Sequence, residues 1–408
     1  MIALRTPAAT SNLSATIEPI LRERLRRPAA WPHRETNGTI AIRIDGAPES
    51  WTVHIKRGVG SLTVGSTRNP TATVSAADAE TLRGILEGTL PGLEAFLAGR
   101  LGVRGNVGLA LKLDLFFPPA RVAADGLSIS PGIRFVDGIE TFFLDSGPRD
   151  APVVVLLHGL GATNVSMLPV LAELARDHRV IAVDLPGFGE SAKPRGSYSF
   201  QWFAEWLAAF LDVLGVDRAS LIGNSMGGRI ALETGLHAPH KVDRLVLLAP
   251  SMAWLAFRHF VPIVRLLRPE LAVLPLRLPR SQVMRGLRMI FADPDRLPVT
   301  WLDAATDEFV HYFRSAQGRI AFFSAARQIY LESARGERGF WDRLPRLKPP
   351  ALFVWGTEDR LVPRGFAAHA SRALPNATSI IFDDCGHVPQ YEVMDRLAPI
   401  MRKFLAGG

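Results

Sequence analysis

The chain has a single cysteine, Cys385, among its 408 residues. It therefore cannot form an intramolecular disulfide and has no need of an oxidising compartment. Long apolar runs are lacking too, since no uncharged apolar run approaches the roughly 20 residues of a membrane span. The opening residues, MIALRTPAATSNLSATIEPI, do not show the basic-then-apolar pattern of a secretion signal. These absences lead us to expect a cytoplasmic protein.

Charge is present but unbalanced: 47 Lys and Arg residues against 39 Asp and Glu residues give a formal net charge of +8. Most of the basic residues are Arg, and they are scattered rather than gathered into a tail. A dispersed excess is typical of a mildly cationic surface, so we expect no nucleic-acid partner, while attraction to anionic lipid stays open. The apolar content of 48% is ordinary for a folded protein, and the length predicts two domains.

The first quarter of the chain mixes helical and strand patterns. Residues 14–27 predict a short amphipathic helix. Four segments with period-two alternation then predict antiparallel strands: 39–45, 51–57, 61–65 and 72–76. Two helical stretches and a final apolar segment follow: 76–88, 91–99 and 107–117. The whole is typical of a small α+β domain.

Residues 118–131 are rich in Pro, Gly, Ala and Ser and predict a linker. After it comes a predicted hairpin, and then buried apolar strands alternate with helices, which indicates an α/β domain with a parallel sheet covered on both faces. The alternation stops at about 251–349, where the pattern is mostly helical, and then resumes. We therefore predict a first domain with its linker over 1–125, and an α/β domain over 126–408 whose helical cap is the insertion.

A G-x-S-x-G pattern is formed by Gly223, Ser225 and Gly227. The bare pattern is a weak signal, because Gly and Ser are common in loops. Here, however, an apolar strand precedes it and a helix follows, as a strand must turn sharply into a helix to project one side chain alone. We predict that Ser225 is a nucleophile.

A serine hydroxyl needs a base and a group that orients the base. In chain order Ser, acid, His, the sequence supplies His387 after the last strand and Asp359 just past the preceding strand. Glu358 is a neighbouring carboxylate that spacing alone does not eliminate. The predicted catalytic residues are thus Ser225, Asp359 and His387, with Glu358 as the alternative acid.

The loop that begins at His158 follows a buried strand, where this architecture places one donor of an oxyanion hole. We expect the donors to be the backbone amides of Met226 and of Leu160, or of Gly161 in place of Leu160. His158 is expected to hold the loop, and Asp184, at another strand end, to shape a turn. This chemistry needs neither a cofactor nor a metal ion, and we expect none.

The motifs HGLGAT, DLPGFGES, GNSMGG, WGTEDRLVP and DDCGHVPQYE together resemble the α/β-hydrolase superfamily across residues 131–408. Two of its branches are similar: the lipases and monoacylglycerol lipases, and the carbon–carbon hydrolases of meta-cleavage products. The second branch usually has HG-x-G-PGA at the oxyanion loop and Trp directly after the catalytic His. Here the loop is HGLGATN and Val388 follows His387, so the resemblance favours ester cleavage.

Three residues keep the carbon–carbon alternative open, namely Asn224 in the GNSMGG motif and the cap arginines Arg314 and Arg319. The superfamily's dehalogenases and epoxide hydrolases use Asp as the nucleophile, so the serine argues against both.

Residues 14–117 resemble the sterol-carrier-protein-2-like lipid-binding family, above all in the run AFLAGRLGVRGNVGLALKL. The resemblance implies a curved sheet whose helices enclose an apolar tunnel. Candidate tunnel residues are Leu82, Leu86, Phe96, Leu97, Leu109 and Leu111. The alternative is that these residues fill a small core.

The resulting hypothesis is a serine hydrolase that cleaves carboxylic esters of small apolar or lipid-like substrates by an acyl-enzyme mechanism. A carbon–carbon hydrolase of the meta-cleavage type is the alternative, and a non-catalytic lipid-binding protein is less favoured. Residues 253–280 mix bulky apolar residues with Arg. This mixture favours a cap that roofs an apolar pocket, but it also fits a helix at a membrane interface, so peripheral membrane association remains an expectation.

Overall fold

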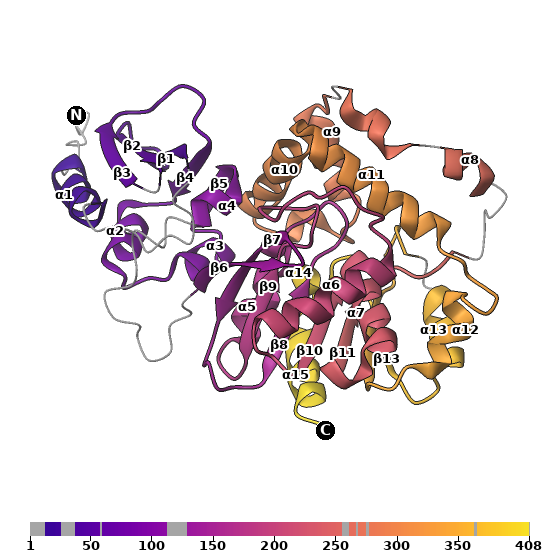
Figure 1. Ribbon diagram of the computed structural model, residues 1–408. Helices are drawn as coiled ribbons and strands as arrows, with labels where there is room; N and C mark the ends of the chain where they lie inside the picture. The colour runs from indigo at the N-terminus through magenta and orange to yellow at the C-terminus, as the bar shows by residue number, and fades with distance from the viewer. Residues whose placement is uncertain are drawn as a thin grey trace, which may run out of the picture. The chain divides into compact units, whose positions relative to one another are not determined.

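The computed structural model describes residues 13–25, 37–57, 59–111, 129–254, 261–266, 268–274, 277–362 and 365–407. The chain divides into two compact units, Met1–Ser128 and Ile129–Gly408, each with its own sheet (Figure 1). The predicted linker lies outside the described residues except for its last three residues, which belong to a strand of the second unit.

The first unit is built on a five-stranded sheet with the order β3-β2-β1-β4-β5. Its strands are β1 (Gly38–Ile44), β2 (Ser50–Lys56), β3 (Val59–Val64), β4 (Ala72–Ala76) and β5 (Leu101–Gly105). The first three form an antiparallel meander, whereas β4 pairs with β1 in parallel. The expectation of purely antiparallel strands is therefore wrong at this pair, because the chain passes from β3 to the far side of β1. Strand β5 was not predicted, since its two glycines hide the alternation.

The helices of this unit bury the apolar positions expected from helical spacing. They are α1 (Leu13–Leu25), α2 (Ala79–Glu87), α3 (Gly92–Leu97) and α4 (Val107–Leu111). In α1 the residues Ile17, Leu21 and Leu25 recur every fourth position and are buried. Of the candidate tunnel residues, four are buried, Leu97 is half-buried, and the side chain of Leu111 lies outside the described set. Burial is what both a tunnel wall and a core require.

The second unit contains an eight-stranded sheet with the order β13-β12-β11-β10-β8-β9-β7-β6. Its strands are β6 (Ile129–Val136), β7 (Ile139–Ser146), β8 (Val153–Leu157), β9 (Arg179–Val183), β10 (Ala219–Asn224), β11 (Val242–Leu248), β12 (Ala351–Gly356) and β13 (Thr378–Phe382). The hairpin β6–β7 is antiparallel and the strands from β9 to β13 are parallel. The predicted α/β class is confirmed.

The strand order reverses at β8, and this reversal locates the site. The chain passes from β8 to β9 in one direction and from β9 back to β10 in the other. Since such crossovers are right-handed, the helix after β8 covers one face of the sheet and the helices around β10 cover the opposite face. The crevice between β8 and β10 is therefore a topological switch point, where open α/β sheets place their ligands.

The helices outside the insertion are α5 (Leu168–Leu174), α6 (Phe200–Val213), α7 (Met226–His237), α13 (Gly365–Ala373), α14 (Pro389–Glu392) and α15 (Met394–Leu405), with 3₁₀ turns η2 (Asn164–Met167) and η3 (Pro239–Lys241). Helix α6 packs against α7, and α5 packs against α15.

The insertion lies between β11 and β12, and its described elements are all helical: α8 (Val261–Leu266), η5 (Pro269–Val273), α9 (Arg280–Arg288), η6 (Pro294–Arg296), α10 (Val299–Arg314), α11 (Ala316–Leu331), α12 (Phe340–Arg343) and η7 (Leu344–Arg346). Helices α8 to α11 are grouped at the top of this unit in Figure 1. Among the described residues, no helix is both long enough and apolar enough to cross a bilayer.

Candidate active site

Ser225 lies in the tight connection between β10 and α7. Its backbone has φ 53° and ψ −114°, a strained conformation for a residue with a side chain. A Cβ added at Gly223 would lie 2.3 Å from the backbone carbon of Gly227, and one added at Gly227 would lie 2.2 Å from the carbonyl oxygen of Leu157. Both positions therefore require glycine, because β10, α7 and β8 approach too closely for any side chain. The G-x-S-x-G pattern forms the predicted sharp turn.

The turn leaves Ser225 accessible within an otherwise closed segment. Every other residue of 219–235 is buried, whereas Ser225 is only half-buried. Its amide donates to the carbonyl of Leu248 at 2.9 Å, and its own carbonyl accepts from Ser251 at 2.9 Å. The main chain is thus held on the end of β11 while the hydroxyl projects from the sheet.

His387 and Asp359 are in direct contact. The His387 Nδ1 donates to the Asp359 Oδ2 at 2.8 Å, and both side chains are almost fully buried. The other carboxylate oxygen accepts the amides of Leu361 at 2.8 Å and of Val362 at 2.9 Å. Glu358, the alternative acid, is exposed. The structure therefore pairs Asp359, and not Glu358, with the histidine.

The histidine loop is bound to the serine turn and to the insertion. Asn224, next to the serine, donates its side-chain amide to the carbonyl of His387 at 3.0 Å. The amide of His387 donates to Ile290 of the insertion at 2.7 Å. Glu392 accepts from Ala292 at 2.7 Å and also from the amide before the histidine. A side-chain amide thus joins segments 163 residues apart in sequence, and a main-chain bond joins the histidine loop to the insertion.

The loop after β8 lies beside the serine. A Cβ added at Gly159 would lie 3.5 Å from the Ser225 Cβ. The amide of Ala162 donates to the carbonyl of Gly159 at 3.2 Å, which closes a turn with Leu160 and Gly161 at its centre. The two central amides are not used by the turn bond itself. The other predicted donor belongs to Met226, the first residue of α7, where helix amides lack intrahelical partners.

His158 holds this loop in place. Its Nε2 accepts the amide of Leu185 at 3.0 Å, so its Nδ1 carries the proton and donates to the carbonyl of Gly159 at 2.8 Å. Complete burial lowers the pKa of His158 to about 4. The imidazole is therefore neutral near neutral pH and serves as a fixed spacer between two loops.

Two acids lie next to the same loop, Asp184 buried and Glu308 half-buried. Asp184 accepts the amides of Asn164 at 2.7 Å and of Glu190 at 2.8 Å, which fits the predicted turn-shaping role. Burial raises the pKa of Asp184 to about 7. Glu308, on α10, bonds to the Thr163 side chain, and burial together with the nearby Asp184 raises its pKa to about 8. The sequence analysis missed Glu308, because a glutamate on an amphipathic helix looks like a solvated residue.

Aromatic side chains from the insertion cover the loop after β8. A Cβ added at Gly161 would lie 2.8 Å from the ring of Phe309 and 3.0 Å from that of Phe322. These two rings pack on Phe313, with centroid separations of 5.3 and 5.5 Å. Phe323 extends the cluster outward and is 38% exposed. The roof beside the site is therefore strongly apolar.

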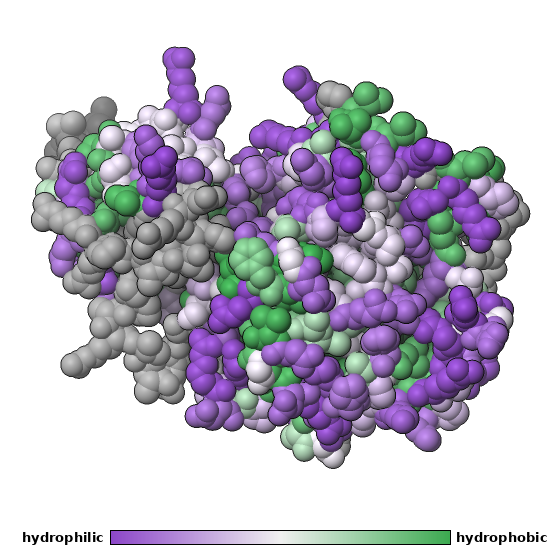
Figure 2. Space-filling view, in the orientation of Figure 1, coloured by the Kyte–Doolittle hydropathy of each residue, from purple (hydrophilic) through white to green (hydrophobic). Residues whose placement is uncertain are grey.

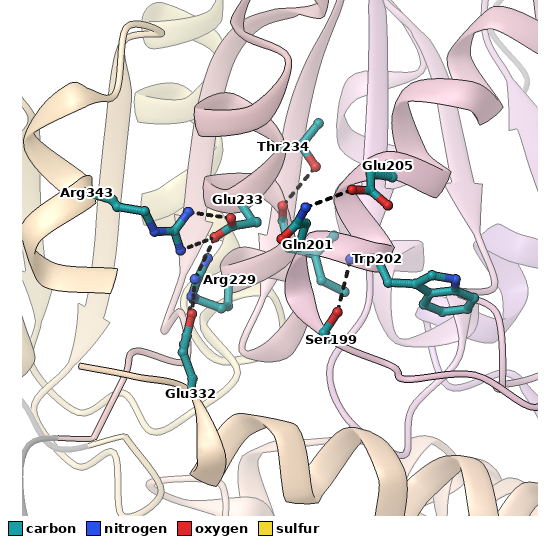
Figure 3. A network of polar contacts seen from close by, with 10 residues as sticks. Ser199, Gln201, Trp202, Glu205, Arg229, Glu233, Thr234, Glu332 and Arg343 are labelled. Carbon is teal, nitrogen blue, oxygen red and sulfur yellow. Dashed lines mark hydrogen bonds and ion pairs between the residues drawn. The ribbon is translucent and has the colours of Figure 1, made fainter. Parts of the chain in front are cut away.

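A buried ionic network joins the serine helix to the insertion (Figure 3). Arg229, fully buried one turn after the serine, binds Glu332 at the end of α11 and Glu233 at 2.7 Å. Arg343 of α12 binds the other side of Glu233. The Arg229 guanidinium also lies 4.1 Å from the centroid of the Phe340 ring. The sequence analysis missed this network, although an Arg and a Glu four apart in an otherwise small and apolar helix were a usable signal.

The described residues offer little support for a metal site or a reactive thiol. No group of three or more His, Cys, Asp or Glu residues suited to a metal ion occurs in the part of the chain that the structure describes. Burial raises the pKa of the Cys385 thiol to about 12, so the thiol stays protonated.

Two family models match the chain. The model described as "alpha/beta hydrolase fold" matches residues 152–392, and that of the "SCP-2 sterol transfer family" matches residues 28–117.

Individual proteins agree with these matches. The chain is 32% identical over 280 residues to 2-hydroxy-6-oxononadienedioate/2-hydroxy-6-oxononatrienedioate hydrolase of Burkholderia vietnamiensis, covering 66% of this chain and 92% of that protein. It is 29% identical over 272 residues to the dihydrolipoyllysine-residue acetyltransferase component of the acetoin cleaving system of Cupriavidus necator, covering 67% and 68%.

Among solved structures, a membrane phospholipase A described as a bacterial virulence factor is 30% identical and superposes with a TM-score of 0.57. The match covers 74% of this chain and 97% of that one. With the sheet order and the serine turn described above, these matches show that the chain belongs to the α/β-hydrolase fold family and carries an SCP2-like domain in front of the hydrolase unit.

Proposed function

We propose that this protein is a serine hydrolase that cleaves carboxylic esters of apolar or lipid-like substrates through an acyl-enzyme. The observation that carries the proposal is the pairing of His387 with Asp359, in a loop that Asn224 ties directly to the strained turn at Ser225. The paired histidine and acid, and the bond from their loop to the residue before the serine, support a role for all three residues in nucleophilic catalysis by serine.

The mechanism follows from these contacts. With the His387 Nδ1 donating to Asp359, the Nε2 is left to take the proton of Ser225 as its oxygen attacks the ester carbonyl. The carboxylate stabilises the imidazolium, and the amides of Met226 and Leu160 donate to the oxyanion, each worth about a hundred- to a thousand-fold in rate. Protonation of the departing alcohol leaves an acyl-serine, which a water activated by the histidine then hydrolyses.

The apolar nature of the substrate is supported by the roof and by the domain in front. Phe309 and Phe322 lie against the oxyanion loop, so a bound acyl group meets aromatic rings rather than charges. The similar membrane phospholipase A acts, by its name, on phospholipids. The SCP2-like domain would hold apolar molecules, and its tether would raise their concentration near the hydrolase unit.

A carbon–carbon hydrolase is the second candidate, and the 32% identical Burkholderia protein is the observation that favours it. Two observations argue against it: Val388 follows the histidine, and neither cap arginine is placed to bind a substrate. Arg319 is buried and donates to main-chain carbonyls, two of them Ala272 and Phe313, while Arg314 is exposed. Arg319 is thus occupied by the cap itself.

The test is an activity panel on aryl esters from acetyl to palmitoyl, with a meta-cleavage dienoate as a further substrate. We expect a preference for longer acyl chains, and Ser225→Ala should lower kcat by about 10⁶-fold, because the rest of the site cannot act without the nucleophile. The exposed Ser197→Ala is the matched control and should not change kcat.

Each alternative outcome is informative. Ester cleavage that survives Ser225→Ala would refute the mechanism, and a preference for acetyl esters would refute the lipid-like substrate. Turnover of the dienoate with inert esters would replace ester by carbon–carbon cleavage. Apolar ligand binding without turnover of any substrate would favour the non-catalytic lipid-binding alternative.

A further inference from the structure

The outer surface of the insertion exposes apolar side chains on two short consecutive elements, α8 and η5. Each of these side chains is more than half exposed: Ile263, Leu266, Leu271, Val273 and Leu274. Figure 2 shows hydrophobic residues over these elements at the upper right, with hydrophilic residues around and between them. We name residues 261–266 and 268–274 the apolar flap. Several strongly exposed apolar side chains on neighbouring elements, rimmed by polar residues, are typical of interaction sites.

The flap is attached through its main chain, which explains why its side chains are free to face outward. Arg319 of α11 donates to the carbonyls of Ala272 at 2.8 Å and Val273 at 3.1 Å. Arg327, on the same helix, donates to the carbonyls of Val264 at 3.1 Å and Arg265 at 2.7 Å. Two arginines thus bind the final carbonyls of two short helical elements. An element attached in this way does not need its own leucines to hold it on α11.

The charge around the flap points to the kind of partner. Arg265, Arg268 and Arg277 are exposed in or beside it, and Glu270 is the single acid of the described residues 261–277. Bulky apolar side chains interleaved with Arg match a bilayer surface, where the apolar groups enter the headgroup boundary and the guanidinium groups meet anionic lipid. A second copy of this chain would bring the same cationic surface against itself, so the charge disfavours self-association.

We propose that the apolar flap docks the hydrolase unit onto an anionic lipid bilayer. The flap lies on α11, and α11 also carries Phe322, which contacts Gly161 of the oxyanion loop. A docked flap therefore places the outer side of the aromatic roof next to the lipid from which an apolar ester would come. The supply of substrate rests on the proposed function, whereas docking itself does not.

The experiment is vesicle flotation of the full-length Ser225→Ala protein, so that no hydrolysis alters the lipid. Vesicles of phosphatidylcholine alone are compared with vesicles containing phosphatidylglycerol. We expect binding to the anionic vesicles that weakens with salt. Leu266→Asp with Leu271→Asp should lower the partition coefficient by at least about ten-fold, and Arg265→Gln with Arg268→Gln by about five-fold per arginine.

The matched control is Val213→Asp, which places the same charge at an exposed apolar position at the end of α6. It should bind as the parent does. Each variant is also made with Ser225 intact, and its melting temperature and turnover of a short water-soluble ester should match those of the parent, which excludes misfolding.

Three results would overturn the proposal. The first is the absence of vesicle binding by the parent, and the second is equal binding by the parent and the flap variants. The third is a concentration-dependent dimer of the parent that the flap variants do not form, which would make the flap an interface between copies. Vesicle binding that depends on the flap in a protein without any esterase activity would refute the proposed function and leave docking intact.

Discussion

The sheet and the insertion of the hydrolase unit are held together in different ways. Around β10 and α7 every residue of 219–235 except Ser225 is buried, and strands approach so closely that glycine is required at two positions. In the insertion, arginine contacts add to the apolar packing. Arg229 of α7 binds Glu332 after α11, whereas Arg280 and Arg319 bind groups within the insertion itself. Close packing leaves one geometry for the reacting groups. Polar contacts can be removed one at a time by mutation, so their contributions can be tested separately.

The largest expected effect is a loss of kcat on substituting a residue that follows a strand of the sheet. Asp359→Asn should lower kcat by about 10⁴-fold without unfolding the protein, because an amide that donates to the Nδ1 of His387 selects the wrong tautomer. Kinetics on a soluble aryl ester measure it. Glu358→Gln removes the neighbouring exposed carboxylate and should leave kcat unchanged. Equal losses in the two variants would mean that the observed pairing is not the working one.

Breaking the ionic contact between α7 and the insertion should have a smaller effect than the loss of Asp359, but it should still destabilise the fold. Arg229→Met leaves Glu332 buried without its cation and should lower the free energy of unfolding by about 3–5 kcal/mol, measured by urea denaturation. The control is Arg335→Gln, which breaks an exposed pair with Asp342 and should leave the free energy of unfolding nearly unchanged. Similar losses at both positions would contradict the distinction between a buried anchor and a surface pair.

The smallest expected effect is a pH dependence of the protein's stability, caused by two acids where the insertion meets the sheet. The pKa values of Asp184 and Glu308 are raised by burial to about 7 and about 8, above their unfolded values. The folded protein therefore binds more protons than the unfolded chain between roughly pH 4 and pH 8, and the stability from these groups falls as pH rises through that window. Glu190 adds negative charge at this contact and Lys193 adds positive charge beside Asp184.

Glu308→Gln should flatten this fall, which melting temperatures measured from pH 5 to pH 8 will reveal. Glu205→Gln, on an exposed face of α6, is the control and should keep the parent slope. Two results would show that these acids do not control the pH dependence. One is a parent melting temperature that rises steadily from pH 5 to pH 8, and the other is an unchanged slope in Glu308→Gln.

What the sequence determined by itself is the local and ordered part of the molecule. Apolar strands alternating with helices predicted the α/β class, because buried parallel strands need continuous apolar runs. The turn at Ser225 was predictable from its glycines, since strand, turn and helix are neighbours in sequence. His387, and an acid at Asp359 or its neighbour Glu358, were predictable from their places after two strand ends, because the carboxyl ends of parallel strands meet at one edge of the sheet.

The tertiary structure alone decided the contacts between distant segments. It paired β4 with β1 in parallel, put Asp359 rather than Glu358 on the histidine, and brought Glu308 to the loop after β8. It also placed Arg229 against Glu332 and left the flap's leucines outside. The physical reason is common to all of these: hydropathy and spacing record the burial that each local segment needs, whereas the partner of a charge, or the exposure of a leucine, depends on which remote element packs against it.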